Sequence, residues 1–240
     1  MSSRDKSFGQ ALLAKFPLSF QRELRRLRYA RQVRRNHLIS PEPEFKGIFK
    51  LVGKGETVVD VGANVGQYTL RLAECVQTYG RVLAFEPVPE TFGYLANNVV
   101  SSGYRNITLF NAACSSDAGV FSMVVPSFES GLSNHYQSHI SRSSDGDFCV
   151  LGLRLDALGI KERISLIKID AEGHDYQVLL GAREVLVRDH PIVIFESGSA
   201  NSDSLMGSIG YRSCQLNGSP NKLYWCAWAD ARVKDLVDNQ

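Results

Sequence analysis

The segment from Val58 to Tyr68 constrains the fold more than any other part of the chain. Its sequence, VVDVGANVGQY, leads from apolar residues typical of a buried strand into a turn with two glycines and then toward a helix. Gly62 and Gly66 allow the backbone to bend tightly and to approach a ligand, while Asp60 places a carboxylate near that ligand. The segment therefore predicts a nucleotide-cofactor site at one end of a parallel sheet.

The spacing of the two glycines narrows the choice of cofactor. A dinucleotide site uses G-x-G-x-x-G, and Asn64 stands where the second glycine of that motif would be. A P-loop needs Lys and Ser or Thr after its last glycine, and neither follows here. What remains is D-x-G-x-x-x-G followed, one helix and one strand later, by Glu86. An acid at that place can accept hydrogen bonds from both hydroxyls of a ribose.

Strands and helices alternate from Lys54 onward, which predicts an α/β fold with a mostly parallel sheet and helices on both faces. A short Asn-Gly-Ser-Pro turn separates two further strands at 211–216 and 222–228, so these two must form an antiparallel hairpin. Residues 120–125 are expected as an inserted strand and 126–146 as a long loop. The other expected strands are 57–61, 82–85, 107–110, 164–169 and 191–195, and the expected helices are 67–79, 90–101, 175–188 and 202–209.

A second group of polar residues follows the expected strand 164–169. Lys168, Asp170 and Glu172 lie at its carboxyl end, where open α/β sheets place their ligand crevice. Because such groups are costly to desolvate, their density at a cleft favours a functional role. For Glu172 a structural interpretation stays equally open, since an acid near a helix N-terminus is stabilised by the helix dipole.

Together these motifs resemble the S-adenosylmethionine-dependent methyltransferases of the Rossmann-like class and, within it, the FkbM family. The resemblance covers about 57–196 and implies a class I methyltransferase fold, with a mostly parallel seven-stranded sheet, an antiparallel C-terminal hairpin and helices on both faces. It implies S-adenosylmethionine as the cofactor and O-methylation of a sugar, a glycan or a secondary metabolite. The segments that carry it are 58–66, 85–87, 111–113, 167–173, His190-Pro191 and Glu196.

The same resemblance implies which residues hold the cofactor. The glycine turn would hold the methionine part, Glu86 the ribose, and Asn111 the adenine side. The complete expected set is Asp60, Gly62, Ala63, Asn64, Gly66, Tyr68, Glu86, Pro87, Asn111, Ala112 and Asp170.

The expected catalytic residues are Lys168, Asp170 and Glu172. A hydroxyl is a poor nucleophile near neutral pH, so a general base would assist its methylation. Asp170 and Lys168 are expected as a pair that orients the hydroxyl or the amino end of the cofactor, with Glu172 next as base or orienter. His174 and His135 are further candidates for the base, and no metal site is predicted, because the sequence does not show that its acids converge.

Residues 1–43 are predicted to form a basic arm ahead of a catalytic domain at 44–240. Residues 1–40 carry ten Lys or Arg and two acids, so the net charge of +2 leaves −6 for the rest of the chain. A mildly acidic domain argues against nucleic acid as a partner. Two alternative functions remain: an RNA methyltransferase that uses the arm, and a cofactor-binding module without activity.

Within the arm, Phe20, Leu24 and Leu27 have the i, i+4, i+7 spacing of an amphipathic helix surrounded by arginines. The first interpretation is that this apolar stripe packs on the domain. The others are a peripheral membrane contact through residues 19–36, an acidic glycan, and RNA.

The five cysteines include no C-x-x-C pair, which indicates neither a disulfide framework nor a zinc site. The sequence also has no run of 18 apolar residues and no signal-peptide core. A cytoplasmic location is therefore expected, and the Arg-rich, acid-poor arm leaves an organelle transit peptide as the alternative.

Overall fold

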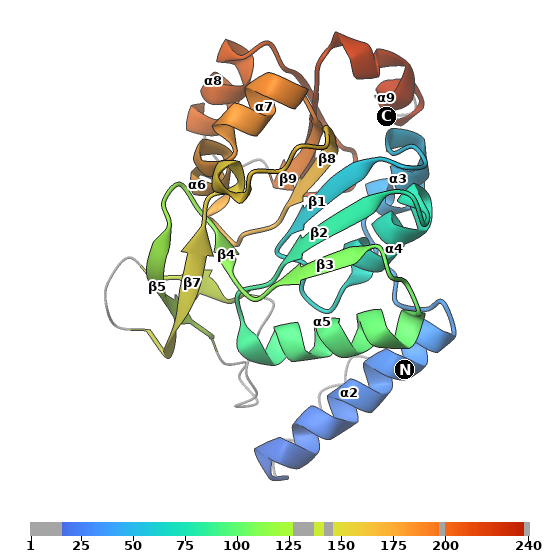
Figure 1. The fold of residues 1–240 in the computed structure, drawn as a ribbon, viewed down its shortest axis with the longest axis vertical. Helices are drawn as coiled ribbons and strands as arrows, with labels where there is room; N and C mark the ends of the chain where they lie inside the picture. The colour runs from blue at the N-terminus through green and yellow to red at the C-terminus, as the bar shows by residue number, and fades with distance from the viewer. Residues whose placement is uncertain (1–15, 127–136, 142–145, 197–199, 238–240) are drawn as a thin grey trace.

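The structure of the chain is a computed structural model, and it describes residues 16–126, 137–141, 146–196 and 200–237. Its centre is a seven-stranded sheet in the order β10-β11-β9-β8-β1-β2-β3 (Figure 1). Only β11 runs against its neighbours, so the predicted fold class and its C-terminal antiparallel hairpin are confirmed. The strands are β1 Thr57–Val61, β2 Arg81–Phe85, β3 Ile107–Phe110, β8 Ile164–Ile169, β9 Ile192–Glu196, β10 Arg212–Gln215 and β11 Asn221–Trp225.

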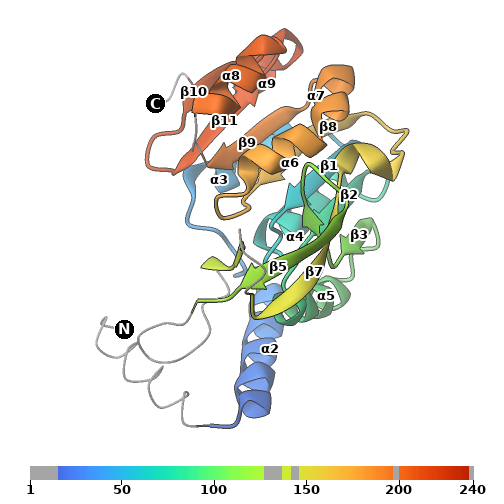
Figure 2. The ribbon, with the colours of Figure 1, turned by 90° about the vertical axis from the view of Figure 1, so that its left-hand side faces the viewer.

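Helices cover both faces of this sheet (Figure 2). Alternate residues of β1 point to opposite faces, so Val58 packs with Leu72 in one apolar cluster and Val59 with Leu179 in another. The first face carries α3 Pro43–Leu51, α4 Gln67–Val76, α5 Pro89–Ser102 and α9 Asp230–Val237. The second face carries α6 Asp175–Gly181, α7 Arg183–Asp189 and α8 Ala200–Ser208. Because both faces are covered, β1 and β8 are buried along their whole length.

A second, four-stranded sheet has the order β4-β7-β5-β6. It contains β4 Ala113–Cys114, β5 Gly119–Val124, β6 His139–Ile140 and β7 Phe148–Leu153. The predicted inserted strand at 120–125 is thus confirmed as β5. The prediction of a loop throughout 126–146 is wrong at 139–140, since β6 pairs there with β5, and residues 127–136 and 142–145 lie outside the described part.

The helix predicted over 175–188 is interrupted at Ala182 and forms two helices, α6 and α7. A Cβ on Gly181 would lie 1.9 Å from the carbonyl oxygen of Ser115, so α6 ends where it meets another segment of backbone. The following helix, α7, receives its cap from a distant residue. The carboxylate of Asp156 accepts hydrogen bonds from the backbone N–H groups of Glu184 and Val185, at 3.1 and 3.0 Å.

We expect Asp156→Ala to lower the free energy of unfolding by about 1–2 kcal/mol, because the first turn of α7 loses this cap. Urea denaturation measures the change. Asp117→Ala is the matched control, since the Asp117 carboxylate is exposed and, among the residues that the structure describes, accepts a hydrogen bond from the neighbouring Ser116 hydroxyl alone. Equal losses in the two variants would contradict the role given to Asp156.

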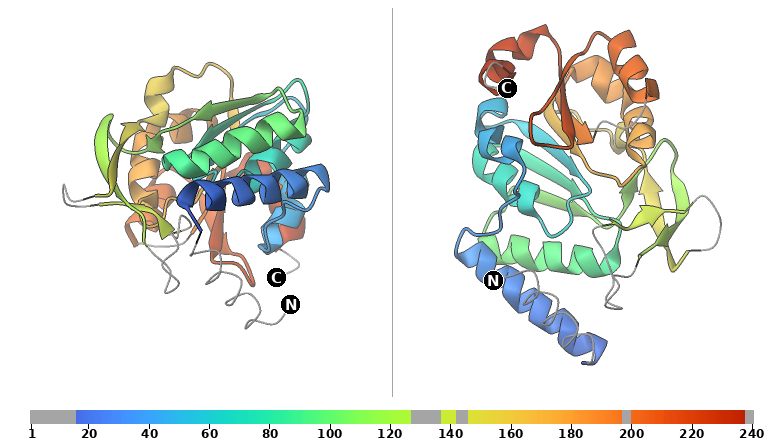
Figure 3. Two further views of the ribbon diagram at one scale, coloured as in Figure 1. Left: turned by 90° about the horizontal axis from the view of Figure 1, so that it is seen from below. Right: turned by 180° about the vertical axis from the view of Figure 1, so that it is seen from behind.

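The predicted helix of the arm is present as α2 Leu18–Arg34, which lies along α5 (Figure 3). Its apolar stripe, however, does not pack on the domain: the side chains of Phe20, Leu24 and Leu27 are 45%, 38% and 52% exposed. The first interpretation of the arm is therefore wrong. The face that meets α5 is the opposite one, held by arginine side chains and by a ring contact. The division of the chain at residue 43 stays a prediction.

No helix within the described ranges is both long enough and apolar enough to cross a bilayer.

Candidate active site

The carboxyl ends of β1 and β8 lie at the point where the order of the strands in the sheet reverses. From β1 the chain continues to β2 and β3 on one side, while β8 and β9 lie on the other. Gly62, at φ 75°, follows β1 directly, and a Cβ there would lie 1.9 Å from the carbonyl oxygen of Asp170. The Asp170 N–H donates to the carbonyl oxygen of Val61 at 3.0 Å. The loops after the two strands are therefore in direct contact, and only glycine fits at position 62.

A pocket of about 600 Å³, open mouth included, lies beside this contact. Its walls come from the loops after β1, β2 and β8 and from the second sheet. Seven of the residues predicted for the site line it: Gly62, Asn64, Glu86, Pro87, Ala112, Asp170 and Glu172. The sequence motifs therefore converge on one pocket, as an active site requires.

Glu86 contributes a buried carboxylate to this pocket. Its Oε2 accepts a hydrogen bond from the N–H of Asn64, and its Oε1 accepts one from the N–H of Val88, both at 2.9 Å. Burial raises the pKa of Glu86 to about 7, against the opposing effect of these two bonds. Each carboxylate oxygen has more than one acceptor position, so both can still receive a hydroxyl of a ligand.

Lys168 lies behind the pocket lining, fully buried, and reaches the site through Asp170. Its Nζ donates to Oδ2 of Asp170 at 2.8 Å and lies 4.9 Å from the ring centre of Tyr68. Burial alone would lower the pKa of Lys168, but the carboxylates of Asp170 and Asp60 raise it above its ordinary value. Lys168 is therefore a charged group that holds the side chain of Asp170 and does not itself line the pocket.

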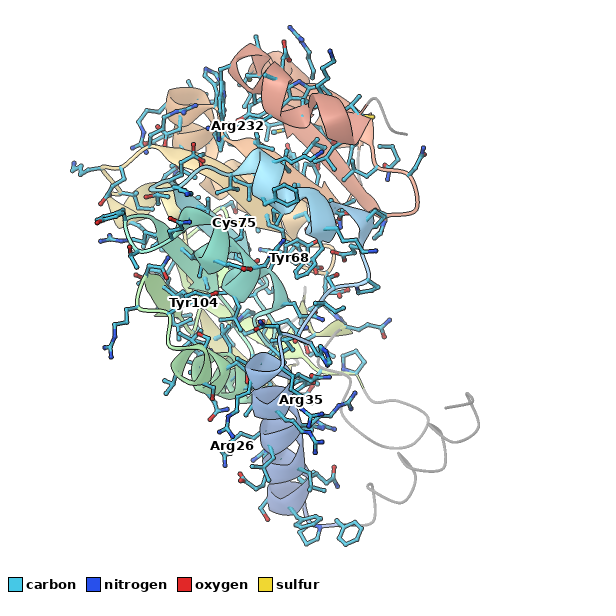
Figure 4. All side chains as sticks on the ribbon, turned by 90° about the vertical axis from the view of Figure 1, so that its right-hand side faces the viewer. Arg26, Arg35, Tyr68, Cys75, Tyr104 and Arg232 are labelled. Carbon is cyan, nitrogen blue, oxygen red and sulfur yellow. The ribbon has the colours of Figure 1, made fainter. Side chains whose placement is uncertain are left out.

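Four of the residues predicted to bind the cofactor, namely Asp60, Ala63, Gly66 and Tyr68, do not line the pocket. Oδ2 of Asp60 accepts the Thr69 hydroxyl at 2.5 Å, and its Oδ1 is buried without a partner in the described structure. The Tyr68 hydroxyl donates to Glu42, in the segment that leads into α3 (Figure 4). The side chains of Asp60 and Tyr68 are thus bonded to other parts of the protein and not directed at the pocket.

Asn111 also lies outside the pocket lining. Its amide nitrogen donates to the carbonyl oxygens of Glu86 and Pro87, at 2.9 and 3.0 Å. These bonds fix the backbone of the wall that carries the Glu86 carboxylate.

Sequence reasoning gave little weight to His174, which the structure places in the pocket wall. The His174 Nε2 and the Ser115 hydroxyl share a hydrogen bond of 2.9 Å, and burial lowers the pKa of His174. Ser115 was not among the predicted residues, although it lies two residues after the segment 111–113, which carries part of the family resemblance. His135 lies outside the described residues. Within the described ranges, no cluster of three or more His, Cys, Asp or Glu residues could hold a metal ion.

Comparison with known proteins identifies the family. Residues 60–209 match the model of the methyltransferase FkbM domain, which is more than half of the chain. This chain belongs to the FkbM methyltransferase family. The match confirms, at the level of the family, the predicted class of enzyme and its cofactor, S-adenosylmethionine.

Two individual proteins are also similar to parts of this chain. The crystal structure of methyltransferase FkbM from Methylobacillus flagellatus KT has a TM-score of 0.52 and 18% sequence identity, and the match covers 71% of this chain and 43% of that chain. A protein-L-isoaspartate O-methyltransferase from Aeropyrum pernix is 38% identical over 85 residues, which are 35% of this chain and 28% of the relative. This FkbM-family chain therefore spans less than half the length of either relative.

Proposed function

We propose that this FkbM-family chain binds S-adenosylmethionine in the pocket and transfers its methyl group to a hydroxyl of a sugar, a glycan or a secondary metabolite. The observation that carries the proposal is the presence of two carboxylates, Glu86 and Asp170, in the lining of one pocket. Glu86 suits the ribose of the donor, and Asp170 suits the hydroxyl of the acceptor.

The residues of the pocket fit the proposed cofactor. Gly62 allows the loops after β1 and β8 to touch, since any Cβ at this position would overlap the carbonyl oxygen of Asp170, and both residues line the pocket. The Glu86 carboxylate would accept the ribose hydroxyls, while Pro87 and Ala112 give the wall an apolar surface. When bound, the cofactor supplies an electrophilic methyl group on a sulfonium.

Asp170 has the surroundings needed to act on a hydroxyl. Lys168 occupies one of its oxygens, Oδ2, and thereby fixes the direction in which the other oxygen points. A fixed carboxylate can align the acceptor for in-line displacement and receive the proton that the hydroxyl loses. Glu172, in the same pocket lining, is the next residue able to take that proton or to orient the pair.

The test is transfer of labelled methyl groups from S-adenosylmethionine to a panel of monosaccharides, oligosaccharides and polyhydroxylated ring compounds. We expect a product with a base-stable methyl ether. RNA and a peptide with L-isoaspartate, the residue in the curated relative's name, are included as competing acceptors. A base-labile methyl ester on the peptide, or label found only in RNA, would contradict the proposal.

Once the screen has identified an acceptor, we expect Asp170→Asn to slow methyl transfer to it by about 10²–10⁴-fold, the usual contribution of a general base. Binding of S-adenosylhomocysteine should change much less, because Glu86 and the glycine turn remain intact. Asp117→Asn, outside the pocket lining, is the matched control. A rate unchanged by Asp170→Asn would remove Asp170 from the mechanism.

A further inference from the structure

The outward surface of α2 has no role in the proposed methyl transfer. We define the outer face of α2 as the side chains that point away from α5, together with the residue that directly follows the helix: Phe20, Leu24, Leu27, Arg28, Arg31, Arg34 and Arg35. We propose that this face binds the surface of an anionic phospholipid bilayer and holds the enzyme there as a peripheral membrane protein.

The opposite side of α2 is firmly attached to the domain. Nε of Arg22 and Nη1 of Arg25 contact the Glu90 carboxylate of α5, at 2.8 and 3.4 Å. Nη1 of Arg26 donates to the side chain of Asn97 at 3.1 Å, and the rings of Tyr29 and Tyr94 lie 5.5 Å apart. These contacts fix the rotation of the helix about its own axis. The outer face is therefore held away from the domain, and α2 extends past the domain's main body (Figure 4).

The apolar part of the outer face is concentrated in the first half of the helix. Phe20 and Leu24 are one turn apart, and Leu27 lies about one turn further along, next to Leu24. Phe16, 44% exposed, extends the stripe, since its ring centre lies 5.0 Å from that of Phe20. A continuous row of exposed aromatic and aliphatic side chains on a fixed helix is the kind of surface that enters the boundary between lipid headgroups and acyl chains.

The basic part of the outer face follows one turn later. Arg28 lies four residues after Leu24, and Arg31 four residues after Leu27, so the arginines continue the two rows of the apolar stripe. Arg28, Arg31, Arg34 and Arg35 form no ion pair within the described part of the chain. Their guanidinium groups would meet lipid phosphates while the apolar side chains enter the layer beneath.

The same charges disfavour the other possible occupants. An isologous dimer across this face would bring two sets of four arginines together, and like charges at an interface oppose association. RNA would satisfy the arginines but would leave Leu24 and Leu27 without a partner, because aliphatic side chains offer bases no stacking surface. An anionic bilayer matches both the charge and the apolar stripe.

The pocket and α2 both lie near the start of α5. Glu90, which receives the two arginines of α2, follows the pocket-lining residues Pro87 and Val88 in sequence. A helix docked on lipid would thus keep this wall of the pocket near the bilayer.

The test is co-sedimentation of the full chain with vesicles of phosphatidylcholine alone and of phosphatidylcholine with phosphatidylserine. We expect binding to the anionic vesicles only. The triple variant Phe20→Ser, Leu24→Ser, Leu27→Ser should lower the partition coefficient at least tenfold. The triple variant Arg28→Gln, Arg31→Gln, Arg34→Gln should lower it about 100-fold, because each arginine near such a surface strengthens binding roughly fivefold.

Matched controls change the same chemistry elsewhere on the surface. Tyr79, Val100 and Val120 are 93%, 82% and 75% exposed, so their replacement by Ser controls for lost apolar surface. Replacing the exposed Arg105, Lys161 and Arg183 by Gln controls for lost charge. Circular dichroism and binding of S-adenosylhomocysteine establish that every variant is folded.

Three results would overturn the proposal. The first is a wild-type chain that stays in the supernatant with anionic vesicles. The second is an equal loss of vesicle binding in the control variants. The third is a dimer, seen by analytical ultracentrifugation, or an RNA complex that depends on the outer face while vesicles do not bind. The vesicle and dimer results do not bear on methyl transfer, and an RNA complex counts against the proposed function only if RNA also receives the labelled methyl group, so the two failures are distinguishable.

Discussion

Replacing Glu86 by Gln is expected to weaken binding of S-adenosylhomocysteine by about 10- to 150-fold at pH 8. The variant keeps the shape of the side chain but loses the charge that accepts the ribose hydroxyls, and a hydrogen bond to a charged group contributes about 1.5–3 kcal/mol. Isothermal titration calorimetry gives both affinities. Glu56→Gln is the matched control, because Glu56 is a half-buried, hydrogen-bonded glutamate that directly precedes β1 and does not line the pocket.

The effect of Glu86→Gln on affinity should depend on pH, and the raised pKa of Glu86 determines the direction of this dependence. That pKa, raised to about 7 by burial, means that the carboxyl of the free protein gains a proton as the pH falls through 7. Because ligand hydroxyls favour the charged form, binding releases this proton, and the affinity of the wild-type protein should rise from pH 6 to 8 and then level off. The affinity of the Glu86→Gln variant should stay flat over that range. A wild-type affinity that is independent of pH would show that the charge of Glu86 takes no part in binding.

Replacing Gly62 by Ala should be the most damaging small change in the chain. The new Cβ would lie 1.9 Å from the carbonyl oxygen of Asp170, and φ at this position is 75°. The backbone conformation costs about 1–2 kcal/mol for an L-residue, and the overlap adds about 1–3 kcal/mol or more. We therefore expect the free energy of unfolding to fall by about 2–5 kcal/mol. Cofactor binding should be lost as well, because relief of the overlap separates the loops that form the pocket.

Gly55→Ala separates these two causes. Gly55 precedes β1 and has a similar φ of 81°, but a Cβ there would meet no atom within 4 Å. The free energy of unfolding of this variant should fall only by the cost of the backbone conformation. The variant should bind S-adenosylhomocysteine as the wild-type protein does. If the two variants are destabilised equally in urea denaturation, the contact between the loops after β1 and β8 contributes nothing measurable.

Much of the fold follows from local sequence signals. The apolar run at 57–61 and the Asn-Gly-Ser-Pro turn predict β1 and the C-terminal hairpin, because burial and turn chemistry act over a few residues. The break at Ala182 is different. It depends on the backbone of Ser115 and the carboxylate of Asp156, which are distant in sequence, and no local pattern reports such contacts.

The site shows the same division. The motifs at Gly62, Glu86 and Asp170 predict that polar groups gather at one edge of the sheet, and the pocket contains all three. The sequence does not predict which polar residues line the pocket and which lie behind it. Packing between strands and helices places Lys168 and Tyr68 behind the lining. The arm gives a further example, because its apolar spacing predicts a helix but does not determine which face meets α5.

The measurement that tests the central claim most directly is a calorimetric titration of the full chain with S-adenosylmethionine and with S-adenosylhomocysteine at pH 8. We expect saturable binding at a single site, strongly weakened in Glu86→Gln and unchanged in Glu56→Gln. Two results would contradict the assignment of this pocket to the methyl donor. The first is a wild-type chain that binds neither compound, and the second is equal affinity of the Glu86→Gln and Glu56→Gln variants.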